Sequence, residues 1–157
     1  MTYSQKYTIV HLLEPMDEGI QFHMSAWPLH ITLADVFAVD ITQQFVEELT
    51  ALLHSIKSCQ SIAGEDTKLG TTKVILVNNS IQLQSIHEAV IHFLESKETI
   101  FNMPQYNYDG FLPHSTISQT TRLLRNDIVN IDNLSIIDMF PSGEWKQRKV
   151  LFTIQVA

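Results

Sequence analysis

Two short segments of this chain repeat one arrangement of side chains: WPLHITL at 27–33 and FLPHSTI at 111–117. In each, a histidine is followed two positions later by a threonine and then by an aliphatic residue. A proline comes one or two positions before the histidine, and an aromatic residue three positions before it. Because side chains alternate between the two faces of a strand, the histidine and the threonine of each segment share one face. The pattern predicts two strands, each of which presents an imidazole and a hydroxyl on one side and apolar side chains on the other.

The rest of the chain shows a mixture of helix and strand signals. Apolar residues recur at three- and four-residue steps over 40–57 and over 80–97, which predicts two amphipathic helices with Asp40 and Ser80 as candidate N-caps. Runs rich in β-formers predict strands at 7–13, 29–37, 61–69 and 72–78, a strand through His114, and a closing hairpin from 133–140 and 148–156. Residues 97–110 are expected to form a surface loop, and residues 120–129 a short helix.

Length and element order predict a single domain over residues 1–157. A chain of 157 residues with 45% hydrophobic and 17% charged residues can bury one core without metal or disulfide support. One histidine strand and one long helix fall in each half of the sequence. We therefore expect an α+β domain of two pseudo-symmetric lobes.

Charge and cysteine content exclude several classes of function. The formal net charge of −7 argues against tight binding to long duplex DNA or RNA, because such binding depends on neutralising phosphates. Cys59 is the only cysteine, which excludes an intramolecular disulfide and any multi-cysteine metal site. No apolar run is long enough for a membrane span, and the first residues do not resemble a signal peptide. We expect a cytoplasmic protein that acts as a monomer and does not contact membranes.

The motifs HITL and HSTI, about eighty residues apart in so short a chain, resemble those of the two-histidine (2H) phosphoesterase superfamily. This superfamily includes 2′-5′ RNA ligase-like proteins and 2′,3′-cyclic nucleotide phosphodiesterases. The resemblance implies a bilobal fold of antiparallel sheets with outer helices around a central groove. It also implies that His30 and His114 are catalytic and that Thr32 and Thr116 bind the phosphate, with no cofactor.

The chemistry of phosphodiester cleavage is consistent with that set of residues. Opening a cyclic phosphodiester requires a base to activate water, an acid to protonate the departing oxygen and donors to the non-bridging oxygens. Histidine can serve in either proton-transfer role, because its usual pKa of about 6.5 lies near working pH. The acidic residues do not gather at metal-ligand spacing, so we expect a metal-independent enzyme acting on a small nucleotide or an RNA end. The sequence does not decide which histidine is the acid.

Further residues are candidates for the substrate groove. Trp27 and Tyr108 precede the two motifs, where a nucleobase could stack, and His11 lies within the strand at 7–13. Many relatives place a basic residue shortly after the motif, whereas the first motif here is followed by Asp35. Arg122 follows the second motif and is the main candidate for a positive charge beside the phosphate. Further basic candidates are Lys73, Arg148 and Lys149.

The segment HEAVIH at 87–92 resembles the zinc-binding pattern HExxH but contains one residue too many. A five-residue step leaves the two imidazoles about 140° apart around a helix, so they cannot share a metal. We expect both His87 and His92 on the partly exposed side of the second helix.

Two other interpretations of the histidine strands remain open. The chain could be a nucleotide-binding or RNA-end-binding module that uses the same groove without turnover. Alternatively, both histidines could be hydrogen-bonded core residues of an unrelated α+β fold.

Overall fold

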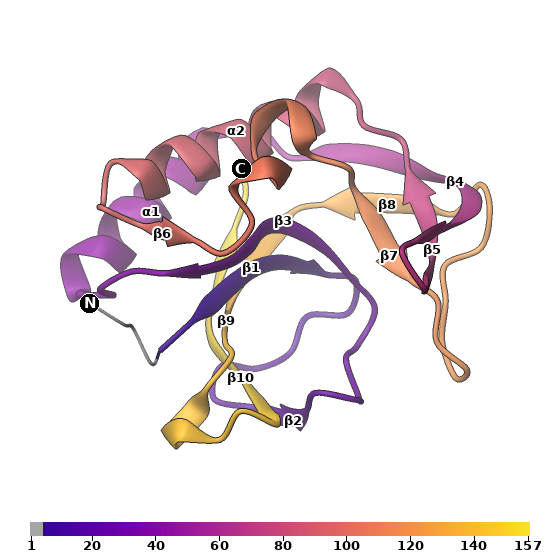
Figure 1. Ribbon diagram of the computed structural model, residues 1–157. Coiled ribbons are helices and arrows are strands. Elements are labelled where there is room, and N and C mark those ends of the chain that lie inside the picture. Colours follow the sequence, from indigo (N-terminus) through magenta and orange to yellow (C-terminus); the bar gives the residue numbers. More distant parts are fainter. Residues whose placement is uncertain (1–4) are drawn as a thin grey trace.

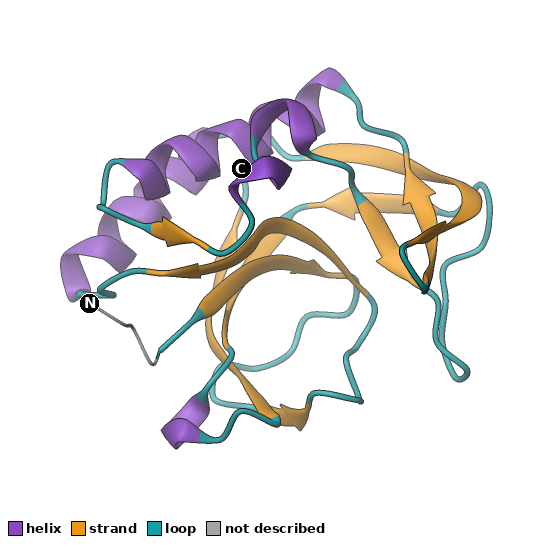
Figure 2. Ribbon diagram, in the orientation of Figure 1, coloured by secondary structure: helices purple, strands orange, loops and turns teal. Residues whose placement is uncertain are grey.

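The computed structural model describes residues 5–157, so the first four residues of the predicted domain lie outside the described part. It consists of two antiparallel sheets and two α-helices (Figures 1 and 2). The larger sheet has the order β2-β10-β9-β1-β3-β6, and the smaller has the order β7-β5-β4-β8. The predicted α+β class with antiparallel sheets in two lobes is confirmed.

The strands of the larger sheet are β1 (Tyr7–Leu12), β2 (Gln21–His23), β3 (His30–Ala38), β6 (Ile100–Phe101), β9 (Asn133–Asp138) and β10 (Gln147–Gln155). The strands of the smaller sheet are β4 (Cys59–Leu69), β5 (Thr72–Val77), β7 (His114–Thr116) and β8 (Ile128–Ile131). Among residues 5–157, no helix is long and apolar enough to cross a membrane.

Both helices begin at a hydroxyl cap. Helix α1 (Gln43–Ser55) is capped by Thr42, whose hydroxyl accepts the Phe45 N–H at 3.1 Å. The prediction of Asp40 as its cap is wrong, because the helix starts two residues later than the hydrophobic periodicity indicates. Helix α2 (Ile81–Glu95) is capped by Ser80, as predicted. Helix α1 packs against β10, whereas α2 packs against β3 and β4 and so contacts both sheets (Figure 1).

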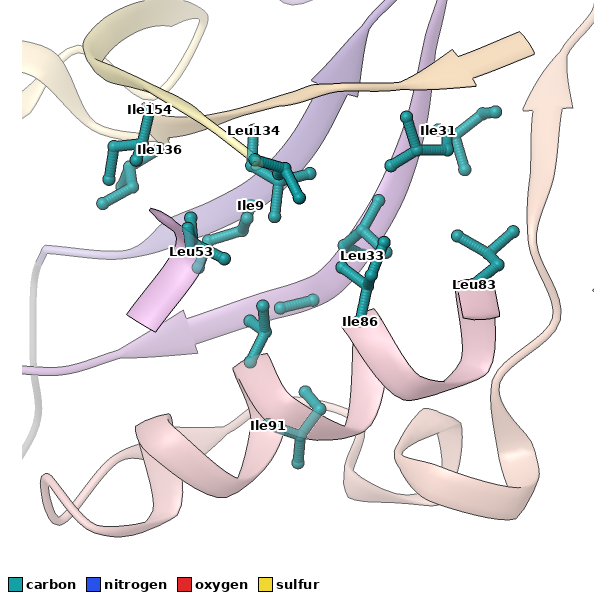
Figure 3. Packing of buried hydrophobic residues seen from close by; sticks show 14 of the residues in the cluster. Ile9, Ile31, Leu33, Leu53, Leu83, Ile86, Ile91, Leu134, Ile136 and Ile154 are labelled. Carbon is teal, nitrogen blue, oxygen red and sulfur yellow. The ribbon is translucent and has the colours of Figure 1, made fainter. Parts of the chain in front are cut away.

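The main core lies between the larger sheet and the helices (Figure 3). From β3 it receives Ile31 and Leu33, which are both buried, and Leu33 lies beside Ile86 of α2 (Figure 3). Burying one such side chain contributes about 1.5–3 kcal/mol. Because these alternate residues of β3 are committed to the core, His30 and Thr32 must face the opposite side of the sheet.

That opposite side carries a second, smaller apolar cluster. Its fully buried members are Val10, Leu12, Ile137 and Val150, and Phe22 and Trp27 pack against it. Leu12 lies directly across from His30, and Val10 from Thr32, so the motif side chains share a face with this cluster.

A bulge in β3 changes the alternation directly after the first motif. Val10 pairs with Thr32, but the preceding residue of β1, Ile9, pairs with Ala34, so β3 carries one extra residue at this point. Leu33 and Ala34 are consequently both buried. The bulge returns Asp35 to the face of Thr32.

Two connecting segments differ from expectation. The predicted loop 97–110 contains the short strand β6 and the 3₁₀ turns η1 (Pro104–Tyr106) and η2 (Tyr108–Gly110). The prediction of a short helix over 120–129 is wrong. Asn126 has a left-handed φ of 74°, which interrupts a helix, and Ile128 and Val129 begin β8 and pair with β4.

Candidate functional site

The two motif strands meet where the edges of the two sheets come together. β6 pairs only with Phe37 and Ala38 of β3, and β3 also contacts β7, the edge strand of the smaller sheet. Thr32 of the first motif and His114 of the second line the same cavity, whose volume is about 580 Å³. Asp35 lines it as well. The fold therefore brings together side chains from the two segments that the sequence pattern singled out.

The two histidines make equivalent hydrogen bonds to the backbone. His30 Nδ1 lies 2.9 Å from the carbonyl oxygen of Pro28, and His114 Nδ1 lies 2.7 Å from that of Leu112. Each acceptor is two residues before its histidine. Because a carbonyl oxygen only accepts, each Nδ1 carries a hydrogen, which leaves Nε2 of the neutral ring as an acceptor. Both rings therefore keep the same nitrogen available for proton transfer.

His30 is half-buried beneath aromatic side chains. The Trp27 ring lies 4.4 Å from the His30 ring, with an angle of 33° between the planes, and the Phe22 ring contacts Trp27 edge-on. Burial is the largest influence on the pKa of His30 and lowers it below its usual value. The Pro28 carbonyl acts in the opposite direction, and charge on His114 lowers the pKa further. A proton on His114 therefore favours neutral His30.

The threonines share the faces of their histidines but differ in exposure. Thr32 is half-buried and lines the cavity. Thr116 is exposed, lies across from the cavity-lining residue Val74 and is not itself a lining residue. His30 is likewise not a lining residue, and the Trp27 ring lies against its ring.

The basic residues considered from the sequence do not line this cavity. Arg122 donates both terminal nitrogens to the Asp66 carboxylate, at 2.6 and 3.0 Å. Lys73 lies between the lining residues Thr72 and Val74 and therefore points to the other face of β5. Arg148 and Lys149 are on β10, and Arg148 donates to the carbonyls of Met139 and Trp145. Among residues 5–157, His114 is the one histidine, lysine or arginine that lines the cavity.

The other residues proposed for the groove do not line this cavity. His11 is buried on the opposite face of the sheet, where it donates to the Asn133 carbonyl at 2.9 Å and lines a separate cavity of about 260 Å³. The Tyr108 hydroxyl donates to Glu95 of α2, and this contact raises the pKa of Tyr108 to about 12. Neither Trp27 nor Tyr108 is a lining residue of the larger cavity.

His87 connects one wall of the cavity to β3, and its predicted exposure is wrong. It is only 1% exposed, because it falls on the buried stripe of α2. Nδ1 donates to the Leu33 carbonyl at 2.6 Å, and Nε2 accepts the Tyr108 N–H at 3.0 Å. The Phe111 ring stacks on it at 3.9 Å, with 4° between the planes. His92, in contrast, is exposed as predicted.

The walls of the cavity come from two segments that the sequence pattern did not place together. One wall is the segment after α2, and the other is the turn joining β4 to β5. The lining residues from these walls are Tyr106, Gly110, Phe111, Leu112, Leu69, Gly70 and Thr72. Phe111 was visible in the sequence as an aromatic residue before the second motif, but nothing there indicates the contribution of the β4–β5 turn.

No protein-family model and no curated protein sequence matches this chain. Solved structures do match it. A structure described as a phosphoesterase superposes with a TM-score of 0.59 at 13% identity, covering 98% of each chain. Escherichia coli LigT in complex with NADP⁺ gives 0.59 at 12% identity, also with 98% coverage of each chain.

A further match, a protein of Thermus thermophilus, gives a TM-score of 0.51 at 13% identity, covering 96% of this chain and 97% of its own. LigT has also been crystallised with 3′-AMP and with ATP. The similarity in each case extends over nearly the whole of both chains. This chain therefore has the two-histidine phosphoesterase fold that its paired motifs predict.

Proposed function

We propose that the chain is a metal-independent phosphodiesterase that opens 2′,3′-cyclic phosphates or related 2′-5′ or cyclic-oligonucleotide phosphodiesters. The observation that carries the proposal is the equivalent arrangement of the two histidines, each with Nδ1 bound to the carbonyl two residues earlier. Such a pair supplies two proton-transfer groups from adjoining strands. The phosphoesterase fold and the nucleotides bound to LigT support the same substrate class.

In the proposed reaction His30 is the base and His114 the acid. Burial lowers the pKa of His30, so its Nε2 begins unprotonated and accepts a proton from the attacking water. The water oxygen forms a bond to phosphorus, and the bond to the 2′ or 3′ oxygen breaks. Protonated His114 gives its Nε2 proton to that leaving oxygen. Solvent then restores both rings to their starting protonation states.

The threonine hydroxyls donate to the non-bridging oxygens in this scheme. Thr32 lines the cavity directly, and Thr116 shares the face of His114. Charge accumulates on these oxygens as water adds to phosphorus, so donors placed there stabilise the transition state. We expect Thr32→Val to lower kcat by about 100-fold, with a smaller loss for the exposed Thr116.

The composition of the cavity favours a diester over a monoester. Among the residues that the structure describes, its lining includes Asp35 and no lysine or arginine. A phosphodiester carries one negative charge, whereas a phosphomonoester carries nearly two above its second pKa of about 6. Binding the second charge beside a carboxylate without a cation is unfavourable.

The test is turnover of nucleoside 2′,3′-cyclic phosphates, cyclic dinucleotides and 2′-5′ linked oligomers in the presence of EDTA. His30→Ala and His114→Ala are each expected to reduce kcat by about 100- to 10,000-fold. His54→Ala, which removes an exposed imidazole of α1, is the matched control and is expected to keep full activity. Full turnover by both site variants, or complete loss in EDTA, contradicts the proposal.

One observation favours a second candidate, a nucleotide-binding module without turnover. Within residues 5–157, Asp35 lines the cavity and no lysine or arginine lines it to stabilise extra charge in a transition state. This alternative predicts that a cyclic nucleotide raises the melting temperature and is recovered intact. Product formation that depends on His30 and His114 would exclude it.

A further inference from the structure

Asp35 is a half-buried carboxylate in the cavity with no role in the proposed proton transfers. Within residues 5–157 it has no side-chain hydrogen bond and no salt bridge. We propose that Asp35 binds the Watson–Crick edge of the substrate base and selects guanine. This inference rests on the proposed phosphodiesterase function and specifies its substrate.

The position of Asp35 fits contact with a base better than contact with phosphate or ribose. Asp35 is three residues beyond Thr32 on the same face of β3, and the bulge at Leu33 and Ala34 puts it there. Because Leu33 and Ala34 of the bulge together face one residue of β1, the two side chains originate about two regular steps apart, or about 7 Å along the strand. The ribose oxygens of a 2′,3′-cyclic phosphate are bonded directly to phosphorus and stay near Thr32. The base edge is the part of the nucleotide that extends to the distance of Asp35.

The chemistry of a carboxylate distinguishes guanine from the other bases. An ionised carboxylate only accepts hydrogen bonds and can accept two side by side. Guanine offers two neighbouring donors, N1–H and the 2-amino group. Adenine and cytosine place one amino donor beside an acceptor nitrogen, and uracil places one N–H between two carbonyls. With those bases, an acceptor would be directed at the carboxylate, which is unfavourable.

The cavity that Asp35 lines also has an aromatic surface. Phe111 lines it, and one face of the Phe111 ring is covered by His87 at 3.9 Å. The surface that Phe111 gives to the cavity is therefore on its other side, and its orientation is fixed by the stack. Tyr106, half exposed, lines the same wall. Stacking on such rings binds any base at about 1–3 kcal/mol, so discrimination among bases must come from a polar group such as Asp35.

A metal ion or a free amine would be a different partner for this carboxylate. The described residues contain no group of three histidine, cysteine or acidic side chains able to hold a metal ion. The aromatic wall and the proposed nucleotide substrate favour a base over an amine.

The experiment compares kcat/KM for the 2′,3′-cyclic phosphates of guanosine, adenosine, cytidine and uridine. The wild-type protein is expected to prefer guanosine by about 10- to 100-fold, the range for a bidentate contact to a base. Asp35→Asn keeps the shape of the side chain but replaces one acceptor oxygen with a donor NH₂ group. It is expected to remove the guanosine preference and to favour adenosine or cytidine, whose edges pair one donor with one acceptor.

The control is Asp109→Asn, which removes an equal charge from an exposed position in η2 outside the cavity lining. It is expected to keep the guanosine preference. Equal turnover of all four nucleotides by the wild-type protein would overturn the inference. An equal rise in kcat/KM for all four cyclic nucleotides in Asp35→Asn would also overturn it, because that result would mean that Asp35 only repels phosphate.

Binding of the four nucleoside 3′-monophosphates, measured by calorimetry, separates this inference from the proposed function. If no cyclic phosphate is turned over but guanosine monophosphate binds best in an Asp35-dependent manner, the base contact stands and the catalytic proposal fails. If turnover depends on His30 and His114 but neither measurement shows a guanine preference, the catalytic proposal stands and the role of Asp35 is wrong.

Discussion

At the scale of single residues, the same hydrogen bond from Nδ1 to a backbone carbonyl serves different purposes in different histidines. His11, His30 and His87 each donate Nδ1–H to a backbone carbonyl, and burial lowers the pKa of each. For His30 this arrangement leaves Nε2 available for a reaction. For His87 the Nε2 atom already accepts the Tyr108 N–H, so that ring is structural.

These lowered pKa values predict a loss of stability in mild acid. The unfolded histidines protonate near their usual pKa of about 6.5, whereas the folded ones resist protonation. The unfolded state therefore binds more protons as the pH falls below about 6.5, and the free energy of unfolding decreases there. The measurement is urea denaturation at about pH 7.5 and about pH 5.5.

His87→Gln tests the contribution of one ring to this pH dependence. The variant is expected to be less stable at both pH values, because the stack on Phe111 is lost. It should nevertheless lose less stability on acidification than the wild-type protein. His54→Gln, on the exposed side of α1, is the matched control. An unchanged pH dependence in His87→Gln would contradict the prediction.

At the scale of elements, the turn that ends in Gly110 shapes one wall of the cavity. A Cβ atom on Gly110 would lie 1.8 Å from the Gln105 carbonyl oxygen, so the constraint is close approach of two backbone segments. Gly110→Ala is expected to destabilise the fold by about 1–3 kcal/mol, because the turn must move. Since Gly110 lines the cavity, kcat/KM should also fall.

The control for this change is Gly64→Ala in β4. A Cβ atom there meets the nearest non-neighbouring atom, the Leu76 carbonyl oxygen, at 3.5 Å, an ordinary contact. Urea denaturation and turnover of both variants are the measurements. Equal losses in the two would show that close approach at Gly110 is not the constraint.

The N-terminus of α1 gives a second test at this scale. Thr42→Ala removes the hydroxyl that accepts the Phe45 N–H and is expected to cost about 1 kcal/mol of stability. Asp40→Ala, two residues earlier and exposed, should change stability by less than half of that. A larger loss for Asp40→Ala in urea denaturation would restore Asp40 as the cap.

Most elements follow from hydrophobic periodicity, which is why both helices and the long strands were predictable. The strands β2, β6 and β8 were missed because they are two to four residues long and depend on neighbouring strands for their hydrogen bonds. The motif faces were predictable from alternation. The bulge that redirects Asp35 was not, because it depends on how β1 pairs with β3. The burial of His87 depends on Phe111 and Tyr108, whose contacts only the fold creates.

At the scale of the whole molecule, the net negative charge and the cavity both disfavour binding of highly charged anions, since no lysine or arginine of the described chain lines the cavity. The net charge of −7 repels anions over the surface, and Asp35 adds to this locally. We predict that a nucleoside 3′-phosphate methyl ester inhibits at least about tenfold more strongly than the corresponding 3′-monophosphate at pH 8, a difference of about 1.4 kcal/mol.

Competitive inhibition constants for the two compounds provide the measurement. The difference should shrink at about pH 6, where the monoester loses part of its second charge. Tighter inhibition by the monoester at pH 8 would show that a cation reaches the phosphate after all.

The position of β1 has a consequence for how the chain folds. β1 pairs with β3 on one side and with β9 on the other, and the His11 contact to Asn133 spans 122 residues of sequence. Such long-range pairing makes folding slow, because a large loop must close before these contacts form. Until β9 arrives, the apolar edge of β1 stays unpaired and is open to strands of other chains. The larger sheet is therefore the part of the molecule most exposed to aggregation during synthesis, whereas the β4–β5 hairpin can form locally.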